Sequence, residues 1–144
     1  MKEVDKRYSF RKLDVWQLAQ ELALDVIEAA AALPSTPATS VLARQFIASA
    51  SSVGANIAEG HGRYSVAAYR NHLLIARGSA CETDSWLDLL KRGGYLDAET
   101  EDRLHRKCDS LVAILTAKIR QLDEIERKRK GKAVRQEPEE YLVE

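Results

Sequence analysis

The chain has 144 residues, a length that suits one domain with a substantial core. Apolar residues make up 45% and charged residues 31%, with only seven glycines and three prolines, which is typical of a helix-rich protein. The 22 Lys and Arg residues balance 22 Asp and Glu residues, so the formal net charge is zero. This balance excludes the whole-molecule attraction of a strongly basic nucleic-acid-binding protein, and any such binding must come from local basic patches.

The two cysteines and the longest apolar run indicate the expected compartment. Cys81 and Cys108 form no CxxC pair and no secretory signal is recognisable, so we favour reduced thiols over a disulfide or a metal role and predict a cytoplasmic protein. The longest apolar run, residues 22–33, contains Asp25 and Glu28 and is too short to span a bilayer. We therefore expect no contact with a membrane.

The amino-terminal residues 1–12 form a basic arm with a local charge of +3, which includes Arg11 and Lys12. Apolar side chains at spacings of three and four then predict a helix over residues 13–33. Pro34 ends this helix because proline disfavours helical backbone in the residue before it.

A second helix is predicted over residues 37–59, with Thr36 as its amino-terminal cap and Pro37 in its first turn. Its middle, residues 48–55, consists of Ala, Ser and Gly apart from one valine. Small side chains let a neighbouring helix approach closely, so we expect a tight helix–helix contact there.

The corner over residues 56–65 combines two glycines, a cation and a helix cap. Gly60 and Gly62 are expected to adopt the positive φ values that end a helix. Ser65 is expected to cap the next helix by accepting hydrogen bonds from its first free N–H groups.

The most regular pattern of the chain predicts a third helix over residues 66–92, with a seven-residue repeat typical of helical bundles. Gly93 and Gly94 end it. Asp97 is then a suitable cap for a fourth helix over residues 98–126.

The pattern fades after residue 126, and residues 127–144 form a charged tail with a basic run that includes Lys128, Arg129 and Lys130. We expect the chain beyond about residue 130 to be loosely ordered. Four amphipathic segments with short connections predict an all-α fold, an up-down-up-down antiparallel four-helix bundle.

Several short motifs resemble those of one known family. In chain order they are Leu13-Asp14-Val15-Trp16-Gln17, Asn56-Ile57-Ala58-Glu59-Gly60 with Gly62-Arg63 and Ser65, Gly78-Ser79 with Glu82, and Gly94-Tyr95-Leu96. Across residues 10–125 the chain resembles the four-helix-bundle proteins of the 23S rRNA-intervening-sequence family. The accessory variability proteins of diversity-generating retroelements are related to that family.

The resemblance implies a four-helix bundle that assembles into a homopentameric ring. For the accessory branch it implies binding of a reverse transcriptase and of nucleic acid through a basic surface, and for the rRNA-encoded branch it implies no particular role. The accessory proteins are strongly basic, whereas this chain is balanced at 22 and 22. The balance weakens the nucleic-acid inference because phosphate contacts supply most non-specific affinity.

The histidines do not form a recognisable catalytic or metal-binding motif. His61, His72 and His105 lie in no HExxH sequence, and the Asp102–His105 spacing lacks the second such pair that a di-iron bundle needs. No residue pattern indicates an activated nucleophile. We expect a solvated His105, no catalytic residue, no metal or other cofactor, and no small-molecule substrate.

Two interpretations of Asn56, Glu59 and Arg63 stay open. They can form a ligand or nucleic-acid site at one end of the bundle. Alternatively, they form a structural network in which Glu59 pairs with Arg63 or a neighbouring helix and Asn56 bonds to backbone. We favour the structural network because buried polar groups must be satisfied.

The basic residues also allow two interpretations. The candidate contacts to nucleic acid or a partner are Arg11, Lys12, Arg63, Arg70, Arg77, Lys128, Arg129 and Lys130. The three arginines from 63 to 77 recur every seven residues. We favour a solvated flank or an intersubunit salt-bridge row with carboxylates such as Asp84 and Asp88.

We therefore predict a non-enzymatic, homo-oligomeric interaction protein with nucleic acid or a reverse transcriptase as candidate partners. The alternative is a ring scaffold that binds another protein and touches no nucleic acid. An enzyme with a site inside the bundle ranks third.

Overall fold

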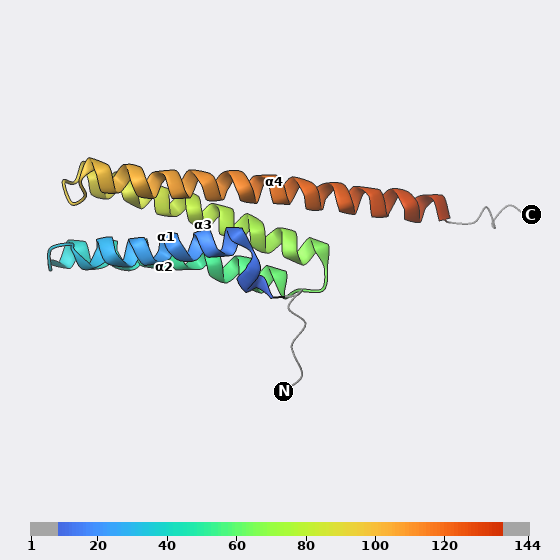
Figure 1. Ribbon diagram of the computed structural model, residues 1–144, viewed down its shortest axis with the longest axis horizontal. Helices are drawn as coiled ribbons and strands as arrows, with labels where there is room; N and C mark the ends of the chain where they lie inside the picture. The colour runs from blue at the N-terminus through green and yellow to red at the C-terminus, as the bar shows by residue number, and fades with distance from the viewer. Residues whose placement is uncertain (1–8, 137–144) are drawn as a thin grey trace, which may run out of the picture.

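The computed structural model describes residues 9–136, in which all regular structure is helical. A short 3-10 helix, η2 (Phe10–Lys12), precedes four α-helices. These are α1 (Asp14–Ala31), α2 (Pro37–His61), α3 (Val66–Arg92) and α4 (Ala98–Gln136). Successive helices run antiparallel along one long axis (Figure 1), which confirms the predicted all-α four-helix arrangement.

The three predicted helix caps are present. Thr36 accepts a hydrogen bond from the N–H of Thr39 at 3.2 Å, and the hydroxyl of Thr39 accepts one from the N–H of Thr36 at 3.0 Å. Ser65 accepts from the N–H of Ala68 at 2.9 Å, and Asp97 accepts from the N–H of Thr100 at 2.7 Å. These side chains satisfy N–H groups that have no partner within the helix.

The corner before α3 differs from the sequence expectation. Positive φ at Gly60 and Gly62 is wrong, because Gly60 is a buried residue of α2 and Gly62 has a φ of −79°. A Cβ at Gly60 would lie 2.7 Å from the Cβ of His72 and 3.0 Å from the ring of Tyr69. Glycine is therefore needed at position 60 for a close approach of α3, and α2 continues to His61 rather than ending at residue 59.

The small residues of α2 make the predicted close contacts. The Thr83 hydroxyl donates to Ser49 at 2.9 Å, and the Ser79 hydroxyl donates to Ser52 at 3.0 Å. Gly54 faces Gln20 of α1 so closely that a Cβ would lie 2.7 Å from its Oε1. The larger core side chains lie on either side of this region and include Leu22, Val26, Phe46, Ile57, Leu73, Leu87, Leu104, Leu111 and Leu115.

A ladder of polar contacts sets the register of α4 against α3. Arg70 pairs with Asp123, Arg77 donates to Thr116 at 3.3 Å, and Asp84 contacts His105 at 2.7 Å. The arginines at 70 and 77 thus have partners within the chain. The intersubunit row expected with Asp84 and Asp88 stays a prediction, and within the chain Asp88 pairs with Arg92 at 2.7 Å.

Helix α4 continues to Gln136, so its expected end at residue 126 is wrong. The register places residue 127 opposite the first residue of α3, and residues 127–136 project beyond it by about 15 Å. Lys128 pairs with Glu124 and Arg129 with Glu126, both at 3.7 Å, and such neighbours support an exposed helix. The rest of the predicted tail, residues 137–144, lies outside the described residues, as do residues 1–8 of the arm.

The helix α1 ends at Ala31, two residues before its expected end at residue 33, and Ala32 and Leu33 lead into Pro34. Within residues 9–136, no helix combines the length and apolar character that crossing a bilayer requires.

Candidate nucleic-acid interface

Contacts near the middle of the bundle divide it into two halves. They join Gln20 to Gly54, Ser52 to Ser79 and Arg77 to Thr116. One half consists of residues 9–20, 54–77 and 116–133, and the other of residues 21–53 and 78–115. The first half contains η2, the α2–α3 corner and the projecting end of α4 (Figure 1).

The two halves carry opposite charge. The first contains 12 Lys and Arg against five Asp and Glu, and the second contains six against 11. We name them the basic half and the acidic half. A formal net charge of zero therefore hides a strongly bipolar molecule, and a local field of this kind attracts polyanions to one end.

The structure brings all of the predicted basic contacts into the basic half. They are Arg11, Lys12, Arg63, Arg70, Arg77, Lys128, Arg129 and Lys130. Five of them have polar partners: besides Lys128 and Arg129, Arg63 donates to Glu59 at 2.7 Å, and the arginines at 70 and 77 bind α4. Arg63 nevertheless leaves 54% of its side chain exposed.

Arg11 and the end of α4 present cations in different ways. The guanidinium of Arg11 lies 5.8 Å from the ring centre of Phe10 and 5.9 Å from that of Trp16, which holds it by cation–π attraction. Residues 127–132 of α4 carry five exposed cations and no acid. They project from the bundle as a helical extension that a partner can approach from several sides.

The polar residues of the corner form an intrachain network. Asn56 donates to the carbonyl of Ser52 at 2.9 Å, and its Oδ1 lies 3.2 Å from Nδ1 of His72. The hydrogen bond from Arg63 lowers the pKa of Glu59, and His72 lowers it further. These are the bonds that the structural interpretation predicts, and they hold Arg63 at the surface beside the corner.

Sequence reasoning missed Tyr64. Its side chain is fully exposed, at 109% of the reference area, between Arg63 and the cap residue Ser65. An open hollow of about 650 Å³ is lined by His61, Gly62, Arg63 and Tyr64. The feature of the sequence that could have identified Tyr64 is its place as an aromatic residue inside a polar corner, outside the apolar stripe of either helix.

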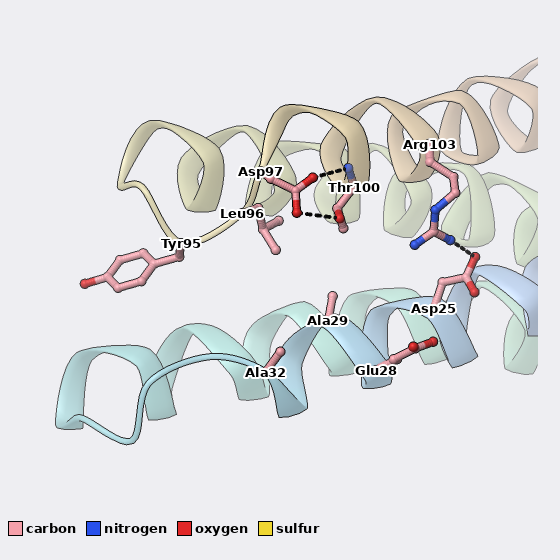
Figure 2. A pocket seen from close by; sticks show the side chains of 9 residues that line it. All are labelled: Asp25, Glu28, Ala29, Ala32, Tyr95, Leu96, Asp97, Thr100 and Arg103. Atoms are coloured by element: carbon pink, nitrogen blue, oxygen red, sulfur yellow. Dashed lines mark hydrogen bonds and ion pairs between the residues drawn. The ribbon is translucent and has the colours of Figure 1, made fainter.

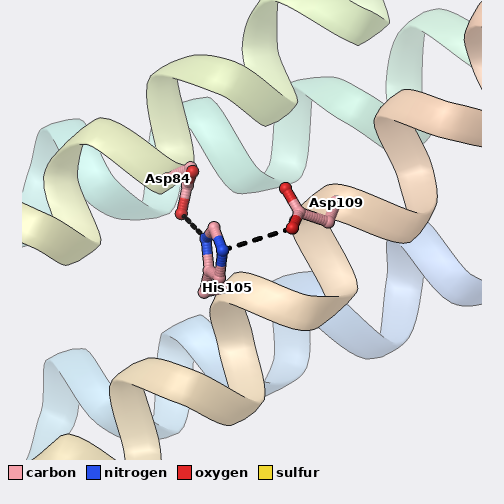
Figure 3. A group of neighbouring side chains, drawn as sticks. All are labelled: Asp84, His105 and Asp109. Carbon is pink, nitrogen blue, oxygen red and sulfur yellow. Dashed lines mark hydrogen bonds and ion pairs between the residues drawn. The ribbon is translucent and has the colours of Figure 1, made fainter.

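The expectation of a solvated His105 holds only in part, because 40% of its side chain is exposed but both ring nitrogens contact carboxylates. Its Nδ1 lies 2.7 Å from Asp84 of α3, and its Nε2 lies 3.2 Å from Asp109 of α4 (Figure 3). The hydrogen bond to Asp84 raises the pKa of His105 despite an opposing effect of desolvation. Because the carboxylates engage opposite sides of the ring, the geometry matches a doubly protonated imidazole held by two ion pairs. A single metal ion would bind only one of the two ring nitrogens, so it would not account for both carboxylate contacts of His105.

A shallow cleft of about 220 Å³ lies in the acidic half, between α1 and the α3–α4 corner (Figure 2). Asp25 pairs there with Arg103 at 3.1 Å and with Lys107. Asp97 is engaged by Thr100 as a helix cap. The charged groups of the cleft are thus largely satisfied by one another, which makes it a weaker ligand site than the basic half.

Comparison with known proteins identifies the family. Residues 11–117 match the family model described as 23S rRNA-intervening sequence protein. A crystal structure from Bacteroides thetaiotaomicron, a protein of unknown function from the S23 ribosomal protein family, is 30% identical in sequence with a TM-score of 0.69. The alignment covers 73% of this chain and 97% of that chain. No curated protein matches the chain. Because the family match spans well over half of its length, the chain belongs to the 23S rRNA-intervening sequence protein family.

Proposed function

We propose that this protein is a non-enzymatic, cytoplasmic interaction protein that binds nucleic acid through its basic half. The separation of charge along the bundle carries the proposal, with 12 cations against five acids at one end. Phosphates are attracted to that end and repelled by the acidic half, so the molecule docks in one orientation.

The exposed basic run of α4 supplies the main part of this attraction. Its five cations over residues 127–132 are exposed, and the ion pairs of Lys128 and Arg129 with glutamates are long, at 3.7 Å, so the run presents a local field that the whole-chain charge conceals. Arg11 and Arg63 add cations from η2 and from the α2–α3 corner, which belong to the same half. The run lies beyond residues 11–117, which match the family model.

Assembly is the second part of the proposal. We propose that copies form a homopentameric ring and that a reverse transcriptase is a candidate protein partner, as the resemblance to the accessory proteins implies. Exposed apolar side chains support contacts between proteins, and they include Leu24, Ile27, Val41, Ile75, Leu89 and Ile114. The same side chains favour the second candidate function, a ring scaffold that binds only protein.

Binding to labelled RNA and DNA oligonucleotides tests the first part. Anisotropy is measured at about 50 mM and about 200 mM salt, with wild type and a K128Q/R129Q/K130Q variant. The variant is expected to lose at least about tenfold in affinity and to show a salt slope shallower by about 2 to 3. The control K91Q/R92Q/R106Q removes equal charge from the acidic half and is expected to bind like wild type.

Two outcomes contradict the proposal. If neither single strands nor duplexes bind at low salt, the nucleic-acid function is lost, because that condition exaggerates attraction to phosphate. Equal losses in both triple variants would show that the charge separation is irrelevant. Light scattering tests assembly separately, and a monomer at micromolar concentration contradicts the ring.

A further inference from the structure

Tyr64 is a large aromatic side chain that the fold does not use. It has the highest exposure of the large hydrophobic residues described, at 109%, whereas nearby Tyr69 packs against the core. Burial raises the pKa of the Tyr69 hydroxyl. Only the exposed ring lies at the tip of the α2–α3 corner, where it is free to meet a ligand.

The corner fixes the backbone on both sides of Tyr64. On its amino-terminal side Arg63 is tied to Glu59 at 2.7 Å, and the N–H of Arg63 donates to the carbonyl of Gly60 at 3.1 Å. On its carboxyl-terminal side Ser65 caps α3. A tyrosine with only two side-chain torsions on a short, hydrogen-bonded corner loses little conformational entropy when it binds.

The surroundings of the ring match the two parts of a nucleotide. An aromatic face stacks on a nucleobase, and an arginine fork binds phosphate oxygens. Tyr64 and Arg63 line the same open hollow of about 650 Å³, and both belong to the basic half. The net positive charge of the basic half favours a polyanion over an apolar peptide as the occupant.

We infer that Tyr64 is a stacking platform for an unpaired nucleobase and that Arg63 binds the adjoining phosphate, so that the basic half prefers single-stranded nucleic acid to duplex. The inference rests on the proposed function and names its substrate class. In a duplex the faces of the bases are covered by their neighbours, so Tyr64 gains no stacking partner there.

The test compares a labelled single strand of about 12 nucleotides with the matching duplex by anisotropy. Tyr64→Ala is expected to weaken binding of the single strand by about tenfold or more and to leave duplex binding unchanged. Tyr64→Phe keeps the ring and is expected to bind like wild type. The matched control is Tyr95→Ala, which removes a tyrosine from the corner at the opposite end of α3.

The salt dependence separates stacking from charge. Tyr64→Ala removes no cation, so its salt slope for the single strand is expected to equal that of wild type, unlike that of the triple α4 variant. Thermal unfolding checks that the exposed substitution leaves the bundle intact. Unchanged single-strand binding by Tyr64→Ala, or equal losses on single strand and duplex, would overturn the stacking role.

Different results would contradict the stacking inference and the proposed function. If wild type binds single strand and duplex equally, and Tyr64→Ala does so too, the stacking inference fails and the proposed function stands. If wild type binds neither form at low salt, the proposed function itself fails.

Discussion

The corner before α3 and the corner after it contain the same ingredients: two glycines, a tyrosine and a helix cap. In the corner after α3, Tyr95 lies against Gly93, where a Cβ would come within 3.0 Å of its ring. Gly94 has a φ of 79° and lets the chain turn back. Tyr64 in the corner before α3 is fully exposed, and the glycines there have no positive φ.

The comparison of the two corners separates residues that the fold requires from a residue that it does not require. In the corner after α3, the glycines, the tyrosine and the cap each have a structural role, and Leu96 packs against the core. In the corner before α3, Gly60 admits a neighbouring helix and Ser65 caps one, while Tyr64 has no such use. A side chain that the fold does not need, beside Arg63 in the basic half, is the first place to look for function.

The largest effect is expected at Gly60, where α3 packs closely against α2. Gly60→Ala is expected to lower the free energy of unfolding by about 1–3 kcal/mol, because the new Cβ would lie 2.7 Å from that of His72. Gly62→Ala is the control in the same corner, where the nearest atom would be 3.5 Å away, and a change within about 0.5 kcal/mol is expected. Urea denaturation measures both, and similar losses in the two variants would contradict the assignment.

The next largest effect is expected at Gly94, whose positive φ lets the chain turn back. Gly94→Ala is expected to lose about 1–2 kcal/mol of unfolding free energy because of its φ of 79°, although a Cβ there would meet no atom within 4 Å. Gly94→Asn is expected to recover part of this loss, since asparagine tolerates left-handed backbone. A Gly94→Ala variant as stable as wild type in urea would contradict the role of positive φ at this position.

The two helix caps are expected to differ in their response to pH. Ser65→Ala is expected to lose about 1 kcal/mol at any pH from about 3 to 7. The N–H of Thr100 lowers the pKa of Asp97 below its usual 3.8, so the stabilisation by Asp97 is present above pH 3.8. It is lost as the pH falls through the lowered pKa, where Asp97→Ala and wild type are expected to converge in melting temperature. A constant difference down to about pH 2 contradicts this assignment.

The smallest effect concerns His105 in the acidic half. Its pKa is raised above 6.5 by Asp84, with contributions from Asp109 and Glu101, so its ion pairs stabilise the fold fully below pH 6.5. This stabilisation is lost as the pH rises through the raised pKa. His105→Gln is expected to lose about 0.2–1 kcal/mol at about pH 5.5 and less at about pH 9, as measured by denaturation at each pH. A loss that grows with pH would reverse the assignment.

Local patterns in the sequence predicted most of the fold. The bounds of α3 match the predicted range 66–92, because its apolar repeat and its flanking glycines and cap agree. The end of α4 was missed because the apolar stripe reports burial, which stops where α3 stops. Lys, Arg and Glu are good helix formers, and they carry the helix to Gln136 without a core to pack on.

The candidate site was less accessible to sequence reasoning because it depends on how the helices are folded back on one another. The separation of charge appears only when residues 9–20, 54–77 and 116–133 are placed at the same end. Asp109 could be anticipated from its position one turn after His105, but Asp84 required the register of α3 and α4. Gly60 faces His72, a contact that no local pattern contains.

The polar ladder between α3 and α4 also limits sliding. If α4 slipped by one heptad in either direction, Arg70 would face Thr116 or Lys130 in place of Asp123, and Asp84 would face Ala98 or Val112 in place of His105. Either slip breaks both contacts, so the ladder as a whole defines one register. By resisting both slips, it determines how far the basic end of α4 reaches beyond the bundle.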